Sequence, residues 1–397
     1  MLICHICGHT NLNNILGVES LTSISSDCLP LGPSHGRAVC LACGTVVTVV
    51  SDEWRELCTN IYAQYQAYRQ SAGSEDLVFL SDGFSSGRSD RLLDLWLTEV
   101  GKAEGLWLDF GCGNGSFMRA IGRRLEGQKL IGMEFDAQRR ADILRIPGVV
   151  DLVTSWDNEL ASNLRVVSMI HVLEHMESPT TLLANAYESL AAGGLLLVQV
   201  PHVWTNPYVI VVGDHATHFD SHSLKWLVES IGFEVEWSQA DLVPGELTLV
   251  ARRPHHAVHL STRNELGQTL IANRSQNSAG EIIAVRAQKL VDNLVATAEW
   301  LNAQRNSHSL LGILGTSIAG TWAAESIGRR HDFWVDEDFS RNDRSWLGRQ
   351  VLKPEKVPDG AKVLAVLAPK KAQTATARLG AQYEAFEVML PPAFGSE

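Results

Sequence analysis

Two pairs of cysteines near the start of the chain have the spacing of metal ligands. Cys4 and Cys7 form one CxxC turn, Cys40 and Cys43 form a second, and a glycine directly follows each pair. Two such turns bring four thiolates to one point, which is the arrangement of a closed, tetrahedral, structural Zn²⁺ site. The 32 residues between the pairs exceed the usual spacing of a zinc ribbon. The cysteines nevertheless predict that residues 1–58 form a zinc-binding module.

Other interpretations of these cysteines are weaker. Disulfides are rare in the cytosol, where we expect the protein because its N-terminus shows no secretory signal. A redox-active CxxC needs only one pair, next to a βαβ unit. His5 and Cys28 are substitute ligands that the spacing favours less. Four cysteine ligands would leave the metal no open position for catalysis.

A second group of residues lies where a strand turns into a helix. The glycine-rich loop 111–115 connects a short apolar strand, 106–110, to a helix that opens at Ser116. Its glycines allow a tight turn and close approach of a ligand to the helix N-terminus. Glu134 lies 23 residues after the first glycine, where an acid can bind ribose hydroxyls. A glycine loop alone is weak evidence, but the strand and helix around it strengthen the prediction.

Strands and helices alternate through residues 105–253. The strands are predicted at 106–110, 129–133, 151–154, 165–170 and 195–200, with a helix at 180–190 and another beginning near 221. Polar residues follow the strands at their carboxyl ends, which is where open α/β sheets bind ligands.

Residues 105–253 resemble a class I S-adenosylmethionine (SAM) methyltransferase in the segments LDFGCGNG, GMEFD, SWD, HVLEHM, AAGGLLLVQVP and DHATHFDSHSL. The resemblance implies that the first loop holds the methionine part of SAM, the acid after strand two the ribose, and the residues after strand three the adenine. The cofactor-binding residues implied are Asp109, Gly111, Gly113, Gly115, Glu134, Phe135, Trp156, Asp157 and His171. A dinucleotide dehydrogenase is the alternative, but GCGNGSF fits its GxGxxG fingerprint less well.

The regions on either side resemble the zinc-binding deoxysugar C-methyltransferases, which act on nucleotide-linked keto sugars. Those enzymes combine a double-CxxC module, a methyltransferase core and a C-terminal Rossmann-like domain. The last of these matches residues 306–397, where LLGILGTSIAG precedes a helix and the strand 333–336. Gly315, Thr316 and Ser317 could bind a substrate phosphate at the helix N-terminus, or could form a turn that only packs helix on strand.

Four polar residues are candidates for acid–base work and substrate binding. The family carries Tyr-His-Glu-His where this chain has Val-Gly-Asp214-His215, so methylation at carbon or at oxygen stays open. His215 is our candidate general base, since histidine titrates near neutrality. Asp214 and His175 are further catalytic candidates, and His202 is a candidate substrate contact after the fifth strand.

Composition limits the remaining classes of function. The 397 residues suggest two or three domains, and 45% are hydrophobic. The net charge of −12 disfavours sequence-independent binding to nucleic acid. No apolar run is long enough for a bilayer, so no membrane partner is expected. Between the predicted domains we expect a helical segment at 59–104 and a connecting helical segment at 254–305.

Together these features predict an α/β protein: a central Rossmann-like class I methyltransferase domain, an N-terminal zinc module and a smaller C-terminal α/β domain. The predicted reaction is transfer of a methyl group from SAM to a small glycan-type acceptor, which the resemblance implies is a nucleotide-linked sugar. Alternatives are an O-methyltransferase of another natural product, or a non-catalytic SAM-binding scaffold.

Overall fold

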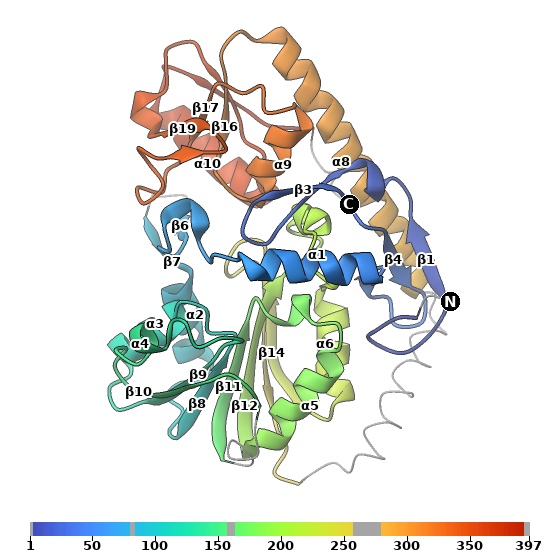
Figure 1. Cartoon of the computed structure of the whole chain (residues 1–397), viewed down its shortest axis with the longest axis vertical. Helices are drawn as coiled ribbons and strands as arrows, with labels where there is room; N and C mark the ends of the chain where they lie inside the picture. Colours follow the sequence, from blue (N-terminus) through green and yellow to red (C-terminus); the bar gives the residue numbers. More distant parts are fainter. Residues whose placement is uncertain (1–2, 80–83, 157–162, 257–278, 393–397) are drawn as a thin grey trace.

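The computed structural model describes residues 3–79, 84–156, 163–256 and 279–392. Figure 1 shows two lobes, each built on a parallel-rich sheet, with helix α1 (Asp52–Ala63) lying across the middle of the molecule. The mixed α/β architecture is the one that the alternation of strands and helices predicts.

The lower lobe contains a seven-stranded sheet in the order β10-β9-β8-β11-β12-β15-β14. Its strands are β8 (Leu106–Phe110), β9 (Lys129–Met133), β10 (Val149–Val153), β11 (Leu164–Ile170), β12 (Leu190–Pro201), β14 (Glu234–Ala240) and β15 (Glu246–Arg252). All neighbours are parallel except β15, which runs antiparallel to both β12 and β14. The strand order reverses between β8 and β11, which places the ligand-binding crevice of such a sheet at their carboxyl ends.

Helices cover both faces of this sheet because successive strand side chains point to opposite sides. Trp107 packs with α2 (Arg88–Glu99) and α3 (Ser116–Arg124). Leu108, the next residue, packs with α5 (Pro179–Ser189) and α6 (Ser221–Ser230). A short helix, α4 (Arg140–Ile143), precedes β10. Helices therefore pack against both faces of the sheet, and polar residues gather at the carboxyl ends of its strands.

The upper lobe is a second, smaller sheet in the order β18-β19-β17-β16-β20-β21. Its elements are β16 (Leu311–Leu314), α9 (Ile318–Ser326), β17 (Phe333–Val335), β18 (Ser345–Trp346), β19 (Arg349–Leu352), β20 (Lys362–Leu364), α10 (Pro369–Gln382) and β21 (Glu387–Met389). Only the pair β18–β19 is antiparallel among these strands. This lobe is the smaller C-terminal α/β domain that the sequence predicts.

The N-terminal region forms a four-stranded sheet of β1 (Leu12–Ile15), β4 (Arg37–Cys40), β5 (Val46–Thr48) and β13 (Thr217–His218). A hairpin of β2 (Thr22–Ile24) and β3 (Pro30–Pro33) lies beside it. Strand β13 lies between β12 and α6 in the chain, and no local sequence pattern predicts its pairing with β5.

Two connecting segments complete the fold. Between α1 and α2, where a helical segment was expected, the described residues include a hairpin of β6 (Leu77–Phe79) and β7 (Ser85–Gly87). The expected helix before the C-terminal lobe is α8 (Ala279–Ser307), whose buried face shares one hydrophobic core with the N-terminal region and with α9. Within the described residues, no helix has both the length and the apolar character needed to cross a bilayer.

Candidate active site

The glycine-rich loop after β8 adopts a backbone conformation that favours glycine. Gly111, Gly113 and Gly115 have φ of 68°, 54° and 80°. A Cβ on Gly111 would lie 2.4 Å from Cγ2 of Val172, and a Cβ on Gly115 would lie 2.5 Å from Cδ1 of Ile146. A Cβ on Gly113 would meet no atom of the described residues within 4 Å. Protein packing thus requires the outer two glycines, whereas Gly113 borders open space.

Glu134 links this loop to the end of β9. Its Oε2 accepts a hydrogen bond from the Gly113 N–H at 2.8 Å, and its Oε1 accepts one from the Phe135 N–H at 3.0 Å. A carboxylate has about four acceptor positions, so Glu134 can still accept two further hydrogen bonds. Phe135 beside it is 74% exposed, so its ring is accessible next to Glu134.

Three other residues predicted to bind the cofactor are Asp109, Trp156 and Asp157. Asp109 is buried and accepts a hydrogen bond from Ser168 Oγ at 2.6 Å. Burial raises the pKa of Asp109 to about 7. Trp156 donates its Nε1 hydrogen to Ser189 Oγ at 2.6 Å. Asp157 lies outside the described residues. The polar atoms of Asp109 and Trp156 therefore fix the ends of their strands to neighbouring elements.

His171 follows β11 with φ of 54° and lies between two buried carboxylates. Its Nδ1 is 3.2 Å from Glu174 Oε1, and its Nε2 is 3.2 Å from Glu246 Oε2. Arg88 Nη1 also donates to Nε2 at 2.6 Å. Arg88 Nη1 is also 3.8 Å from Glu246 Oε1, so the guanidinium, the imidazole and the two carboxylates form one group of contacts. Sequence analysis missed Arg88 and Glu246, which come from distant elements and match no short motif.

Asp214 pairs with His175 rather than with His215, its neighbour in sequence. The Oδ2 of Asp214 is 3.4 Å from Nδ1 of His175, which also lies 3.0 Å from the backbone oxygen of Asp214. Ser26 donates to the same carboxylate from its N–H at 2.9 Å and from its hydroxyl at 2.5 Å. The Tyr62 hydroxyl lies 3.1 Å from His175 Nδ1. This tyrosine belongs to α1 and is 46% exposed.

The rings of His175 and His215 are in edge-to-face contact, with centroids 4.8 Å apart. Burial opposes charging of His175, but the hydrogen bond and negative charge of Asp214 outweigh it and raise the pKa of His175 to about 9. Burial, together with the nearby positive charge of His175, holds the pKa of His215 well below its ordinary value. The two pKa shifts are therefore opposite in direction: they favour the charged form of His175 and the neutral form of His215.

Glu174 completes this cluster. One of its oxygens and one ring nitrogen from each of His175 and His215 lie within 4.8 Å of one another. A divalent ion could use such donors, but Glu174 already faces His171 and His175 already pairs with Asp214. The cluster is thus better described as a set of acid–base groups than as a metal centre.

His202, predicted as a substrate contact, lies in a local turn after β12. It is 7% exposed, and its Nδ1 lies 3.1 Å from Thr205 Oγ1 and accepts a hydrogen bond from the Thr205 N–H at 3.3 Å. Burial lowers the pKa of His202. The polar contacts of His202 therefore stabilise the turn that contains it.

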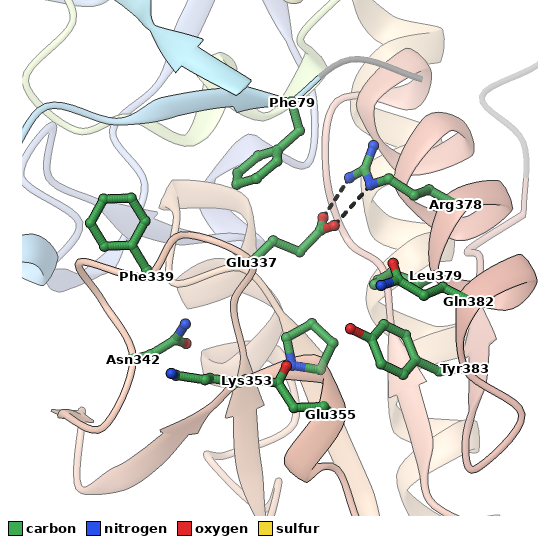
Figure 2. A pocket seen from close by; sticks show the side chains of 11 residues that line it. Phe79, Glu337, Phe339, Asn342, Lys353, Glu355, Arg378, Leu379, Gln382 and Tyr383 are labelled. Atoms are coloured by element: carbon green, nitrogen blue, oxygen red, sulfur yellow. Dashed lines mark hydrogen bonds and ion pairs between the residues drawn. The ribbon is translucent and has the colours of Figure 1, made fainter. Parts of the chain in front are cut away.

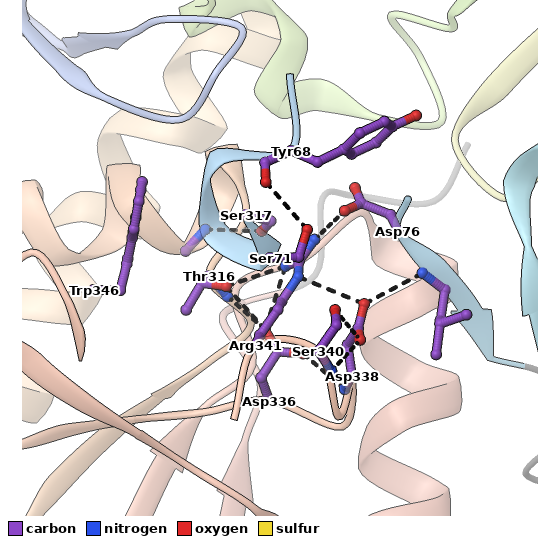
Figure 3. A network of polar contacts seen from close by, with 12 residues as sticks. Tyr68, Ser71, Asp76, Thr316, Ser317, Asp336, Asp338, Ser340, Arg341 and Trp346 are labelled. Atoms are coloured by element: carbon purple, nitrogen blue, oxygen red, sulfur yellow. Dashed lines mark hydrogen bonds and ion pairs between the residues drawn. The ribbon is translucent and has the colours of Figure 1, made fainter. Parts of the chain in front are cut away.

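The loop after β16 resembles the loop after β8, but its polar groups have protein partners. Thr316 donates from both its N–H and its hydroxyl to Asp336 Oδ2, each at 3.0 Å, and Ser317 caps α9 by accepting from the Gly320 N–H. Arg341 donates to Thr316 Oγ1 and contacts Asp336, as Figure 3 shows. This geometry favours a packing turn for Gly315–Ser317 over a phosphate site.

A cavity of about 300 Å³ lies in the same lobe, between the residues that follow β17 and β19 and one face of α10. Figure 2 shows Glu337 and Arg378 joined there by an ion pair, with N···O distances of 2.9 and 2.6 Å. Phe79, from β6, and Phe339 line the same cavity. It is separate from the histidine cluster, none of whose residues lines it.

The four N-terminal cysteines converge. Their sulfurs lie within 4.8 Å of one another, with Cys4–Cys43 at 3.8 Å and Cys7–Cys40 at 3.5 Å. Zn–S bonds of about 2.3 Å would place tetrahedral sulfurs about 3.8 Å apart, so the donor set fits zinc. The substitute ligands lie elsewhere: His5 contacts β13, and Cys28 is outside the cluster.

Comparison with known proteins identifies the central region. Residues 84–237 match the family model described as a methyltransferase domain. This match assigns a methyltransferase domain to the central region of the chain. The open space at Gly113, the free acceptor positions of Glu134 and the exposed Phe135 fit the bound cofactor. SAM would lie over this loop and would supply the methyl group.

Solved structures give distant likenesses only. A SAM-dependent methyltransferase from Mesorhizobium loti is 16% identical, with a TM-score of 0.35, and the match covers 44% of this chain and 100% of that one. A 1,6-didemethyltoxoflavin-N1-methyltransferase from Burkholderia thailandensis, bound to its substrate and S-adenosylhomocysteine, is 15% identical, with a TM-score of 0.40 and coverage of 53% and 96%. Among curated proteins, none matches this chain.

Proposed function

We propose that this methyltransferase transfers the methyl group of SAM to a small glycan-type acceptor, a nucleotide-linked sugar, with His215 as general base. The observation that carries the proposal is the contact between the rings of His215 and His175, whose Nδ1 faces the carboxylate of Asp214. The acceptor class follows from the resemblance of the three-part chain to deoxysugar methyltransferases.

The histidine pair suits an acceptor that loses a proton and develops negative charge on oxygen. His215 would take the proton either from a hydroxyl or from a carbon next to a ketone. The positive charge on His175 would stabilise the resulting alkoxide or enolate oxygen. The electron pair released on the acceptor then forms the new bond to the methyl carbon, while the pair of the broken C–S bond stays on sulfur.

We also propose that Cys4, Cys7, Cys40 and Cys43 hold a structural Zn²⁺ ion. Three of the four side chains are completely buried, and each knuckle closes on a glycine N–H: Gly8 donates to Cys4 O and Gly44 to Cys40 O. Metal analysis of protein purified without chelator should give one zinc per chain; its absence would contradict the assignment.

The base assignment is tested with His215→Ala, and with the exposed His222→Ala on α6 as control. The probes are nucleoside diphosphate-linked sugars, with and without a keto group, and the readout is S-adenosylhomocysteine. We expect His215→Ala to keep SAM affinity in calorimetry and to lose roughly 10²–10⁴ in turnover. Turnover at the wild-type rate would reject His215 as the base.

A second measurement separates carbon from oxygen methylation. In D₂O, with S-adenosylhomocysteine in place of SAM, a base acting on a keto sugar should exchange the proton next to the ketone for deuterium. Mass spectrometry would detect this exchange in wild type and not in His215→Ala. Methylated product without any exchange in wild type would instead favour a hydroxyl acceptor.

A further inference from the structure

The segment that carries Asp214 and His215 leaves its own sheet and joins the cysteine-bearing one. Thr217 and His218 form β13, which pairs antiparallel with Val47 and Val46 of β5. The methyltransferase domain therefore completes the N-terminal sheet, although about 170 residues separate the two strands in sequence. A module that merely stabilised the chain would not need to build its sheet from this loop.

Backbone hydrogen bonds hold the start of this segment to the N-terminal region. The Gly213 N–H donates to Ile24 O at 2.8 Å, and the Trp54 Nε1 hydrogen is donated to Gly213 O at 2.7 Å. Arg37 Nη2 donates to Val212 O at 2.9 Å. Each partner comes from a different element of the N-terminal region, so the loop position depends on that whole region.

Thr48, the last residue of β5, holds the candidate base itself. Its hydroxyl donates to the backbone oxygen of His215 at 2.5 Å, and its N–H donates to the oxygen of Ala216 at 2.9 Å. Thr48 is 2% exposed and His215 is 4% exposed, so little water could replace these contacts. From the other side, the Ala216 N–H donates to Glu174 O at 2.8 Å.

Both cysteine knuckles reach this loop. The first knuckle contains His5, whose Nε2 lies 2.8 Å from Thr217 Oγ1. The second knuckle connects β4, which ends at Cys40, to β5, which begins at Val46. A metal ion that fixes both knuckles would therefore also fix the contact of His5 with Thr217 and the pairing of β5 with β13.

We propose that the cysteine module is part of the active site: metal held by its four thiolates sets the position of the Asp214–His218 segment, and Thr48 is the positioning residue for His215. The catalytic consequence of this inference rests on the proposed function. The contacts between the cysteine module and the Asp214–His218 segment do not depend on that function. Loss of the metal would free the knuckles and, through β5, the loop that places the base.

Hydrogen–deuterium exchange of the full-length protein tests the structural part without any activity measurement. Zinc is removed by chelation and its loss is verified by metal analysis. We expect amides of residues 212–218 to exchange at least tenfold faster, while those of β8 and β9 on the cofactor side stay protected. Unchanged protection of 212–218 in zinc-free protein would overturn the proposal.

Thr48→Val keeps the proposal testable if zinc-free protein unfolds. This variant retains the strand and loses only the hydroxyl, and Thr48→Ser should rescue it; Thr10→Val, at an exposed position of the same module, is the matched control. We expect about a tenfold loss in kcat with unchanged SAM affinity and faster exchange at 214–216. Wild-type kcat and wild-type exchange in Thr48→Val would reject the positioning role. Faster exchange with normal activity in His215→Ala would instead contradict the proposed base.

Discussion

The two lobes repeat one local design, a strand, a glycine turn and a helix, with an acid at the end of the second strand. In the first lobe Glu134 accepts from the Gly113 N–H, and in the second Asp336 accepts from the Thr316 N–H. Open space borders Gly113, whereas Arg341 occupies the side of Thr316 and ties Asp336 into the protein. The loop after β8 thus leaves the room that the proposed cofactor site needs, whereas the loop after β16 makes an internal contact.

Strands β11 and β20, which pair with the first strand of their lobes, β8 and β16, also end differently. After β11 the chain continues with His171, Glu174 and His175, while after β20 it continues with the buried, apolar Ala365 and Val366. A glycine turn binds a ligand only when neighbouring strand ends leave room and supply polar groups. This difference between the lobes agrees with methyl transfer in the first lobe. At the corresponding strand ends of the second lobe, the residues pack against protein instead.

Substitution of the central glycine should give the largest difference between the lobes. Gly113→Val fills the space that the cofactor would occupy and strains a residue with φ of 54°. We expect at least a 100-fold loss of SAM affinity in calorimetry. Gly315→Val, at φ of 83°, should lower the melting temperature but leave SAM affinity unchanged. Equal losses of SAM affinity would contradict the distinction between the two loops.

Removal of the two acids should separate affinity from stability. Glu134→Ala removes hydrogen bonds from a charged acceptor, worth roughly 1.5–3 kcal/mol, or about 10- to 150-fold in SAM affinity. Asp336→Ala leaves the Thr316 groups without their partner and should destabilise the fold by about 1–3 kcal/mol with no effect on SAM binding. Calorimetric titration and thermal unfolding of both variants measure the two effects. If Asp336→Ala weakened SAM binding as much as Glu134→Ala, the two acids would share one function.

His175, which follows β11, predicts that kcat depends on pH. The residues after β20 in the second lobe are apolar and predict no such dependence. The pKa of His175 is raised above its ordinary value to about 9, so its pairing with Asp214 contributes fully below about pH 6.5 and is lost as the pH rises through 9. We expect kcat to fall about tenfold per pH unit above 9. Asp214→Asn should move this fall to lower pH. A profile that is flat to pH 10 in wild type would remove the cationic His175 from the mechanism.

Local patterns predicted the elements of this fold well, because a strand, its turn and its helix are contiguous in sequence. β8 and β9 begin and end where the sequence predicts, and the four cysteines converge as their spacing indicates. The partners of the histidines could not be predicted in this way. Asp214 pairs with His175 across 39 residues and with Ser26 across 188, and only tertiary packing brings them together.

Loss of the Thr316 hydroxyl should have the smallest effect and gives the most specific test of the second loop. Thr316 Oγ1 donates to Asp336 and accepts from Arg341, so Thr316→Val breaks contacts that are internal to the protein. One buried hydrogen bond contributes roughly 1 kcal/mol, and we expect a destabilisation of that order in chemical unfolding. Turnover and the KM for the acceptor should not change, because the hydroxyl faces protein rather than ligand. If the KM for a nucleotide-linked acceptor rose while stability stayed constant, the loop would bind phosphate, and the second lobe would share in substrate recognition.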